Sequence, residues 1–358
     1  MKVFHHPDTL AHVPKLFYRQ GALVGHPEQP GRADLLRRSC ETAGHEMVAL
    51  AEPVDLLGGR PLARSEAQLP SSDVAALLRV HDADYLAFLS EAWTRRGELP
   101  GAPDTIVATH LARPHMHRRP NALLGQVGYH MADTSTPILA ETWRSALASA
   151  EVALAGARAV LGGETSAYAL CRPPGHHAYA DSAGGFCYLN NSAIAAAEIQ
   201  AATQGGVAIV DIDVHAGNGT QGVFYESADV TTVSVHVDPS DYFPFYAGYA
   251  DETGAGAGEG HNLNIPLPLG TGDEAWLAAV QHGLRAALSV RPAVLVIALG
   301  LDASRDDPLQ GMAVTLEGFR RAGALIASAR RPTLLVQEGG YLQPSLGDAL
   351  TAVLEGFG

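Results

Sequence analysis

The sequence predicts an α/β protein with a single parallel β-sheet flanked by helices on both faces, and three observations lead to this class. Four short runs are almost wholly apolar and stop at glycine or polar residues, as strands buried on both faces do. Helical patterns lie between these runs, and strands that alternate with helices form right-handed parallel units. The 358 residues, 47% of them hydrophobic, suffice for a large core without disulfides.

The expected elements follow one another through the C-terminal two thirds of the chain. The strands are expected over residues 206–210, 230–235, 293–299 and 333–336. The helices are expected over residues 146–161, 192–202, 274–288 and 316–330. Residues 94–136 are rich in proline, glycine, arginine and histidine and have no clear period, so we expect a long ordered loop or insertion there. Nothing resembles a linker between two cores, and residues 1–358 are predicted to form one domain.

Charge and cysteine content exclude several classes of protein. The 24 Lys and Arg residues against 38 Asp and Glu give a formal net charge of -14, which disfavours binding to nucleic acid or to acidic lipid. The three cysteines, Cys40, Cys171 and Cys187, form no CxxC pair, which favours the reducing cytoplasm. Glu151 and Arg158 interrupt the apolar stretch 146–161, and the first residues soon turn polar, so we expect neither a membrane span nor a signal peptide.

Candidate metal ligands follow two of the expected strands. Strand periodicity places Asp211, Asp213 and His215 on one side of the chain directly after residues 206–210. Asp302 follows strand 293–299 in the same way, and ligands of parallel sheets bind at the carboxyl ends of the strands. A lone Asp-x-Asp segment is more often a helix cap. Two carboxylates and one imidazole nevertheless form a three-ligand set that suits a catalytic Zn²⁺, and Fe²⁺ also accepts it.

Two adjacent histidines provide the base that such a site needs. Anionic ligands acidify bound water less than neutral imidazoles do, so a separate general base is required. The segment Arg172-Pro173-Pro174-Gly175 fixes the loop that ends in His176 and His177. Asp211 and Asn218 are each able to orient one imidazole, which is how a general base is tuned. Adjacent histidines are also common as surface or structural residues, and that alternative stays open here.

A tyrosine follows the last expected strand. Gln337-Glu338-Gly339-Gly340-Tyr341 comes directly after residues 333–336, and its paired glycines permit a close approach of the backbone. A tyrosine in a turn is usually a packing residue. The Tyr341 hydroxyl is instead a neutral donor that is able to stabilise an oxyanion beside a metal ion.

Together these motifs resemble the zinc-dependent histone deacetylase superfamily. The matching segments are RPPGHHA at 172–178, GGFCYLNNSAIAA at 184–196, DIDVHAGNGTQ at 211–221, GLDA at 300–303 with Asp307-Pro308, and EGGY at 338–341. Residues 26–32, 80–86, 125–129 and 133–138 resemble the bacterial acetylpolyamine amidohydrolases. The resemblance implies the arginase/deacetylase fold and removal of an acetyl or short acyl group from the primary amine of an acetylpolyamine or similar small acetylated amine.

The resemblance also implies a role for individual residues. It implies zinc at Asp213, His215 and Asp302, His177 as general base, His176 as electrostatic support, Tyr341 as the group that polarises the acyl carbonyl, and Asp211 and Asn218 as the residues that orient the histidines. It further implies a structural K⁺ at the side chains of Asp211 and Ser234, and an apolar tube walled by Phe186 and Tyr246. The insertion at 94–136 resembles the loop through which the polyamine enzymes dimerise, and this resemblance implies a homodimer.

Two positions depart from the family pattern, and three alternative functions remain open. Ala216 stands where the family usually has a second histidine, and Leu124 stands where some relatives carry an acid. Glu98 and Asp104 are then the candidates to meet a distal ammonium group of the substrate. The alternatives are a protein-lysine deacetylase, a binuclear manganese enzyme of the arginase type, and a non-catalytic protein that binds acylated amines.

Overall fold

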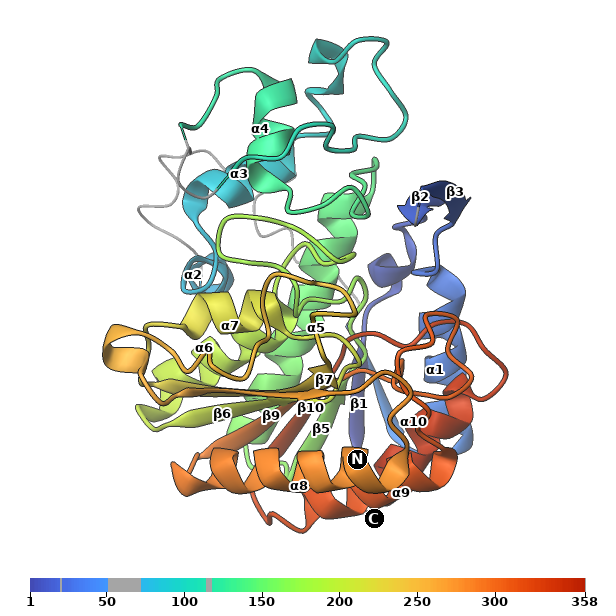
Figure 1. Cartoon of the computed structure of the whole chain (residues 1–358), viewed down its shortest axis with the longest axis vertical. Helices are drawn as coiled ribbons and strands as arrows, with labels where there is room; N and C mark the ends of the chain where they lie inside the picture. Colours follow the sequence, from blue (N-terminus) through green and yellow to red (C-terminus); the bar gives the residue numbers. More distant parts are fainter. Residues whose placement is uncertain (20, 51–71, 114–117, 358) are drawn as a thin grey trace.

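A computed structural model of the chain describes residues 1–19, 21–50, 72–113 and 118–357 (Figure 1). The strands are β1 (Lys2–His5), β2 (Leu16–Arg19), β3 (Ala22–Gly25), β4 (Glu46–Ala49), β5 (Ser166–Ala169), β6 (Val207–Asp211), β7 (Val230–Val237), β8 (Asn262–Leu267), β9 (Val294–Leu299) and β10 (Thr333–Gln337). The helices are α1 (Pro30–Thr42), α2 (Ser72–Leu78), α3 (Ala83–Glu91), α4 (Leu123–His130), α5 (Thr142–Leu161), α6 (Asn191–Thr203), α7 (Asn218–Phe224), α8 (Asp273–Ser289), α9 (Leu316–Ala327) and α10 (Leu346–Glu355). Short 3₁₀ turns are η1 (Pro7–Leu10), η3 (Arg96–Glu98) and η4 (Gly256–Gly258).

The main sheet has eight strands in the order β4-β1-β5-β10-β9-β6-β7-β8, and each neighbouring pair is parallel. The predicted fold class is therefore confirmed. The four strands expected from the sequence are β6, β7, β9 and β10, with ends that differ by at most two residues. Strands β1, β4, β5 and β8 and the antiparallel hairpin of β2 and β3 were not predicted.

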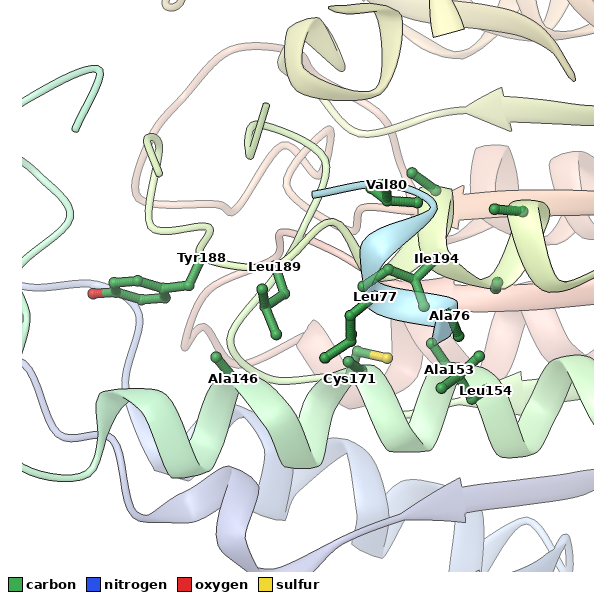
Figure 2. Packing of buried hydrophobic residues seen from close by; sticks show 14 of the residues in the cluster. Ala76, Leu77, Val80, Ala146, Ala153, Leu154, Cys171, Tyr188, Leu189 and Ile194 are labelled. Atoms are coloured by element: carbon green, nitrogen blue, oxygen red, sulfur yellow. The ribbon is translucent and has the colours of Figure 1, made fainter. Parts of the chain in front are cut away.

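Helices cover both faces of this sheet (Figure 1). Alternate strand residues point to opposite faces, so Ile209 and Val296 belong to one apolar cluster, while Val210 and Ile297 belong to the other. The first cluster packs against α5 and α6 and the second against α1, α8, α9 and α10. Figure 2 shows part of the first cluster, in which side chains of α2 meet those of α5 and α6. Both faces of the sheet are therefore shielded from solvent, as the continuous apolar runs indicate.

Residues 94–136 are more regular than the sequence analysis expects. The insertion contains η3 and the eight-residue helix α4, and Ile106 pairs with Ile138 beyond its end. Gly125 and Gly128 lower the helix propensity of α4 and hide its period in the sequence. A Cβ at Gly128 would lie 1.9 Å from the carbonyl oxygen of His110, so the glycine is needed for close packing. In Figure 1, α3, α4 and the β2–β3 hairpin lie at the end of the molecule opposite α8 and α9.

Within the described ranges, no helix is both long enough and apolar enough to cross a membrane.

His81 joins the loop before α3 to the start of α6. Its Nδ1 donates to the carbonyl oxygen of Tyr179 at 3.0 Å, and its Nε2 accepts from the backbone N–H of Asn190 at 2.9 Å. Burial lowers the pKa of His81 to about 4, although hydrogen bonds to backbone carbonyl groups oppose that shift. The ring is therefore neutral, and a second proton on Nε2 would break the bond from Asn190.

Acid should destabilise the protein partly through this histidine. The unfolded chain binds the proton at a pKa near 6.5, so the contribution of His81 is complete above that pH and is lost as the pH falls towards 4, by about 3 kcal/mol. Urea unfolding at pH 7, 5.5 and 4.5 should show this loss, and His81→Gln should have a smaller slope of unfolding free energy against pH. The exposed His282→Gln is the control. An unchanged slope in His81→Gln would contradict the assignment.

Candidate active site

The three predicted metal ligands meet at the carboxyl ends of β6 and β9. Single ligand atoms of Asp213, His215 and Asp302 all lie within 4.8 Å of one another. The Nδ1 of His215 is 3.0 Å from Asp213 Oδ1 and 3.4 Å from Asp302 Oδ2. All three residues are buried. They converge because β6 and β9 are neighbours in the sheet and end at the same edge.

Two glycines allow the backbone to enclose these carboxylates. A Cβ at Gly300 would lie 2.3 Å from Asp213 Oδ2, and one at Gly339 would lie 2.0 Å from Asp302 Oδ2. The backbone N–H of Gly339 donates to Asp213 Oδ2 at 2.8 Å, and that of Val214 donates to Asp302 Oδ1 at 3.0 Å. Main-chain donors therefore orient both carboxylates, and any side chain at Gly339 would displace the carboxylates of Asp213 and Asp302.

The electrostatics of these residues fit a bound cation. Burial opposes charge on His215, but its hydrogen bond with Asp213 and the charges of Asp213 and Asp302 outweigh it and raise the pKa of His215 to about 9. Burial, together with the charge of Asp213, raises the pKa of the Asp302 carboxyl. Asp302 Oδ2 is buried and accepts no hydrogen bond from the described residues. Two buried carboxylates and one imidazole leave excess negative charge, which a divalent metal ion would compensate.

Each histidine of the adjacent pair has its own oxygen partner. His176 Nδ1 lies 2.9 Å from Asp211 Oδ2, and His177 Nδ1 lies 2.6 Å from Asn218 Oδ1. An amide oxygen only accepts, so the Nδ1 of His177 carries the hydrogen and its Nε2 keeps the lone pair. Asn218 is held in turn, because its Nδ2 donates to the hydroxyl of Tyr179 at 3.1 Å. The structure thus brings together the base and the orienting residues named from the sequence.

The two imidazoles carry different charges. Burial opposes charge on His176, but the Asp213 and Asp211 carboxylates prevail and hold its pKa well above the usual range. Burial and the positive charges of His176 and His215 hold the pKa of His177 well below the usual range. His176 is therefore a cation, and His177 is a neutral proton acceptor. Such a divergence of two neighbouring groups is typical of an acid and base pair.

Glu338, to which the sequence analysis gave no role, holds the histidine loop in place. Its Oε2 accepts from the backbone N–H groups of Gly175 at 2.6 Å and His176 at 3.0 Å. Its Oε1 accepts from the Ser192 hydroxyl at 2.7 Å. The position of Glu338 directly after an apolar strand is the signal by which the sequence marks it, as for Asp302.

Tyr341 reaches the same edge from β10. Its side chain is buried, and burial together with the charge of Asp302 holds the pKa of the phenol well above its usual range. The Tyr341 backbone N–H donates to Asp307 Oδ2 at 3.0 Å, and the Arg32 guanidinium lies 5.4 Å from the centre of the Tyr341 ring. The hydroxyl therefore remains protonated and is able to act as a donor.

A pocket of about 350 Å³ leads to these groups. His177, His215 and Tyr341 line it and are almost fully buried, so they form its deep end. The apolar wall consists of Phe17, Phe186, Tyr242, Phe243, Phe245 and Leu309. The predicted tube wall at Phe186 is thus part of the pocket.

The expectation for Tyr246 is wrong. This residue is 92% exposed and is not among the lining residues. The chain turns at Pro244 and Phe245, whose φ is +65°, and this turn sends Tyr246 outwards while Phe243 lines the pocket. A cluster of aromatic residues in the loop after strand β7 is the sequence signal for Tyr242 and Phe243, and Tyr246 is the wrong member of that cluster.

Comparison with known proteins decides the family. A family model described as the histone deacetylase domain matches residues 26–357. The chain belongs to the histone deacetylase family. The resemblance predicted from the motifs is thereby confirmed. Family membership indicates a metal cofactor, and Asp213, His215 and Asp302 form a candidate group to hold it.

Individual members of the family are similar over most or all of the chain. The acetylpolyamine amidohydrolase of Burkholderia pseudomallei is 41% identical over 361 residues, covering 100% of this chain and 99% of the relative. Acetylpolyamine amidohydrolase 1 of Pseudomonas aeruginosa is 43% identical over 78% of this chain and 82% of its own length. The crystal structure of the Burkholderia pseudomallei acetylpolyamine aminohydrolase has a TM-score of 0.91 at 39% identity and covers 100% of this chain and 98% of that chain. The chain is therefore an enzyme that acts on amides, a deacetylase with the arginase/deacetylase fold.

Both departures from the histone deacetylase pattern have a place in the structure. Ala216 is buried, and a Cβ at Gly248 would lie 2.6 Å from the Cβ of Ala216. The small side chain thus lets the loop after β7 pack directly behind the site. Leu124 lies on α4, is 49% exposed and does not line the pocket.

The acids suggested for a distal ammonium group lie elsewhere. Glu98 makes an ion pair with Arg95 at 2.8 Å, and neither Glu98 nor Asp104 lines the pocket. The expectation that Glu98 and Asp104 meet the substrate is therefore wrong for the pocket of a single chain. Helix α4 and the bridge from Ile106 to Ile138 hold the insertion in a position where neither acid lines the pocket. The acids that line the pocket are Asp133 and Asp241.

Asp133 builds one wall of the deacetylase pocket. Its Oδ2 accepts from the Gly185 backbone N–H at 2.6 Å, and its Oδ1 accepts from the backbone N–H and hydroxyl of Ser135 and from the hydroxyl of Thr136. Gly185 and Phe186 are both left-handed, with φ of +54° and +71°. A Cβ at Gly185 would lie 2.2 Å from His177 Cδ2, so this turn also lies against the base. Asp133 therefore fixes Phe186 and supports His177.

Replacing Asp133 with asparagine should loosen this wall. Because the amide loses charge-assisted bonds to Gly185 and Ser135, we expect a loss of about 1–3 kcal/mol in unfolding free energy and about a tenfold fall in kcat/KM. Urea unfolding and steady-state kinetics of the zinc-loaded enzyme measure both quantities. Asp104→Asn, an exposed change in the same insertion, should alter neither. Wild-type kinetics in Asp133→Asn would show that the turn does not depend on this carboxylate.

Proposed function

We propose that this enzyme is a zinc-dependent amidohydrolase that removes an acetyl or short acyl group from the primary amine of an acetylpolyamine or a similar small acetylated amine. One observation carries the proposal: the buried Asp213, His215 and Asp302 cluster lies at a pocket that His177, His215 and Tyr341 line together with apolar side chains. The names of the similar enzymes, acetylpolyamine amidohydrolases, support the substrate class.

The residues of the chain divide the chemistry between them. Asp213, His215 and Asp302 would hold the Zn²⁺, or Fe²⁺, which when bound would supply a Lewis acid for the acyl carbonyl and for water. Phe186, Phe243 and Leu309 enclose the aliphatic part of the substrate and exclude solvent.

Proton transfer falls to His177. Its neutral Nε2 accepts a proton from the attacking water and later returns it to the leaving amine, while Asn218 holds the ring through Nδ1. Protonated His176 and the phenol of Tyr341 stabilise negative charge on the former carbonyl oxygen. The products are a carboxylate and a free primary amine.

A substrate panel tests this proposal. Protein loaded with zinc, or with Fe²⁺ under anaerobic conditions, should hydrolyse acetylputrescine and acetylcadaverine with a higher kcat/KM than an acetyl-lysine peptide. A preference for the peptide would instead identify a protein-lysine deacetylase. Tight binding of acetylamines without turnover by metal-loaded protein would identify a binding protein, and two metal ions per chain would favour the arginase type.

Tyr341→Phe should lower kcat by about 10²–10³-fold and leave KM nearly unchanged, because the hydroxyl acts on the oxyanion rather than on the bound ground state. Zinc content should stay at the wild-type value, since Tyr341 is not among the ligands. Tyr246→Phe removes the same atom from an exposed side chain and should retain full activity. Equal kinetics in the two variants would remove Tyr341 from the mechanism.

We also propose a structural K⁺ at Asp211 and Ser234. The two residues are register partners on β6 and β7, and both are buried behind the metal ligands. Replacing NaCl with KCl at constant ionic strength should raise the thermal unfolding midpoint of the wild type, and Ser234→Ala should show a smaller rise. Identical midpoints in the two salts would contradict this site.

For the assembly we propose a cytoplasmic homodimer formed through residues 94–136. Leu111 and Leu124 of this insertion are 46% and 49% exposed, which supports a contact with a second copy. Light scattering of the wild type should give twice the chain mass, and the double variant Leu111→Glu with Leu124→Glu should give the mass of one chain.

The three cysteines are buried and free, which supports the cytoplasm, a reducing compartment, as the location of the enzyme.

A further inference from the structure

The mouth of the pocket carries two charges of opposite sign. Arg19, Asp133 and Asp241 are the lining residues with charged side chains other than histidine. Asp133 already accepts four hydrogen bonds from Ser135, Thr136 and Gly185 in the pocket wall. Arg19 and Asp241 are different: among the described residues, neither makes an ion pair with an opposite charge.

Arg19 and Asp241 line the same pocket from segments that are linked through residues 308–309. Arg19 is the last residue of β2, and its Nη1 donates to the carbonyl oxygen of Pro308 at 3.4 Å. The next residue, Leu309, lines the pocket and accepts a 2.9 Å hydrogen bond from the hydroxyl of Tyr242. Asp241 immediately precedes Tyr242. Contacts through residues 308–309 and Tyr242 thus connect the two segments that bring Arg19 and Asp241 to the pocket lining.

This arrangement restricts the head group of a bound substrate. An acylated aliphatic chain that fills the apolar pocket and reaches His177 leaves its other end at the mouth. A polyamine offers only positive charge there, which suits Asp241 but is repelled by Arg19. A head group with one ammonium and one carboxylate satisfies both residues, and a guanidinium prefers a carboxylate because it binds it with two parallel hydrogen bonds.

We propose that the pocket also accepts free Nω-acyl amino acids, such as the acetyl derivatives of lysine and ornithine, with the α-carboxylate at Arg19 and the α-ammonium at Asp241. This inference rests on the proposed amide hydrolysis and adds a substrate class to the same site. Water adds to the acyl carbon, the carbon–nitrogen bond breaks, and the proton from water passes to the ω-amine, which gives a carboxylate and the free amino acid. A lysine within a polypeptide lacks both charges and gains nothing from this pair.

A matched pair of substrates tests the role of the carboxylate. Nε-acetyl-L-lysine is acetylcadaverine with one α-carboxylate added, so the ratio of their kcat/KM values isolates that group. We expect zinc-loaded wild type to favour acetyl-L-lysine by about two- to fivefold, the scale of partly exposed charge pairs. Two charged contacts and the acyl chain make three points of attachment, so the D and L forms should react at different rates.

Two variants assign the contacts. Arg19→Gln should abolish the advantage of acetyl-L-lysine and should speed acetylcadaverine hydrolysis, because it removes a positive charge that repels the free ammonium group. Asp241→Asn should lower hydrolysis of both compounds relative to the uncharged N-pentylacetamide. Arg285→Gln and Asp229→Asn, which change exposed residues that do not line the pocket, should leave the ratio unaltered.

The outcomes separate this inference from the proposed function. Hydrolysis of acetylcadaverine with no gain for acetyl-L-lysine, or an equal effect of Arg19→Gln on both compounds, overturns the inference and leaves the proposed function intact. Failure to hydrolyse all the amides, including N-pentylacetamide, by zinc-loaded protein overturns both. Equal rates for the two enantiomers also contradict a two-charge contact.

Discussion

Asp302→Asn is expected to abolish deacetylase activity and to remove most of the metal affinity, while the metal-free protein stays folded. The change removes one of the two anionic ligands, and the Lewis acid supplies several kcal/mol of transition-state stabilisation. Because each factor of ten in rate corresponds to about 1.4 kcal/mol, we expect kcat/KM to fall by at least about 10³-fold. Metal analysis after dialysis against zinc and steady-state kinetics measure the two losses.

Stability gives an independent readout of the same change. At 1,000 times its Kd, zinc should stabilise the wild type by about 4 kcal/mol and should stabilise Asp302→Asn much less. Without metal, the variant should be at least as stable as the wild type, because the amide relieves the repulsion between buried Asp213 and Asp302 and keeps the bond from Val214.

The control for this prediction is Asp229→Asn, which makes the same chemical change at an exposed position. It should retain activity, metal content and the stabilisation by zinc. Full zinc stabilisation of Asp302→Asn would show that the ion binds at other residues.

His177→Ala is expected to lower kcat by about 10³-fold without loss of the metal. His177 is the neutral imidazole whose Nε2 remains free to accept a proton, and general base catalysis contributes about 10²–10⁴-fold. The ligands Asp213, His215 and Asp302 are untouched, so zinc content and the stabilisation by zinc should match the wild type. Single-turnover kinetics with acetylcadaverine separates the chemical step from product release.

Two comparisons make this result specific. His282→Ala removes an exposed imidazole on α8 and should leave kcat unchanged. Asn218→Ala retains the base but frees its ring, so it should lower kcat by a smaller factor of about 10–100-fold. A His177→Ala enzyme with wild-type kcat, or one that has lost its zinc, would reject the role assigned to this residue.

The sequence predicted much of the fold and the deep end of the site, for a definable reason. Strands β6, β9 and β10 are buried on both faces, so they are continuous apolar runs, and the polar residues that follow them stand out. Asp213, Asp302 and Tyr341 were found in this way. Strands β1 and β4 are only four residues long and less buried, and their local pattern is correspondingly weak.

The outer part of the pocket was predicted less well. Tyr246 was chosen as a wall residue, but the left-handed Phe245 turns it into solvent. Glu98 and Asp104 were expected to meet the substrate, but the packing of α4 holds their segment away from the pocket lining. Arg19 lies on the β2–β3 hairpin, which the sequence analysis did not identify.

The sequence by itself determined the parallel α/β architecture and the set of side chains that meet at the deep end of the pocket, because strand ends in a parallel sheet meet at one edge whatever the loops do. Only the tertiary structure decided which loop residues enclose the pocket and which charges border its mouth. Those positions depend on contacts between segments far apart in the chain, such as Asp133 with Gly185 and Arg19 with Pro308. The local sequence of one such segment does not indicate which distant segment it will contact.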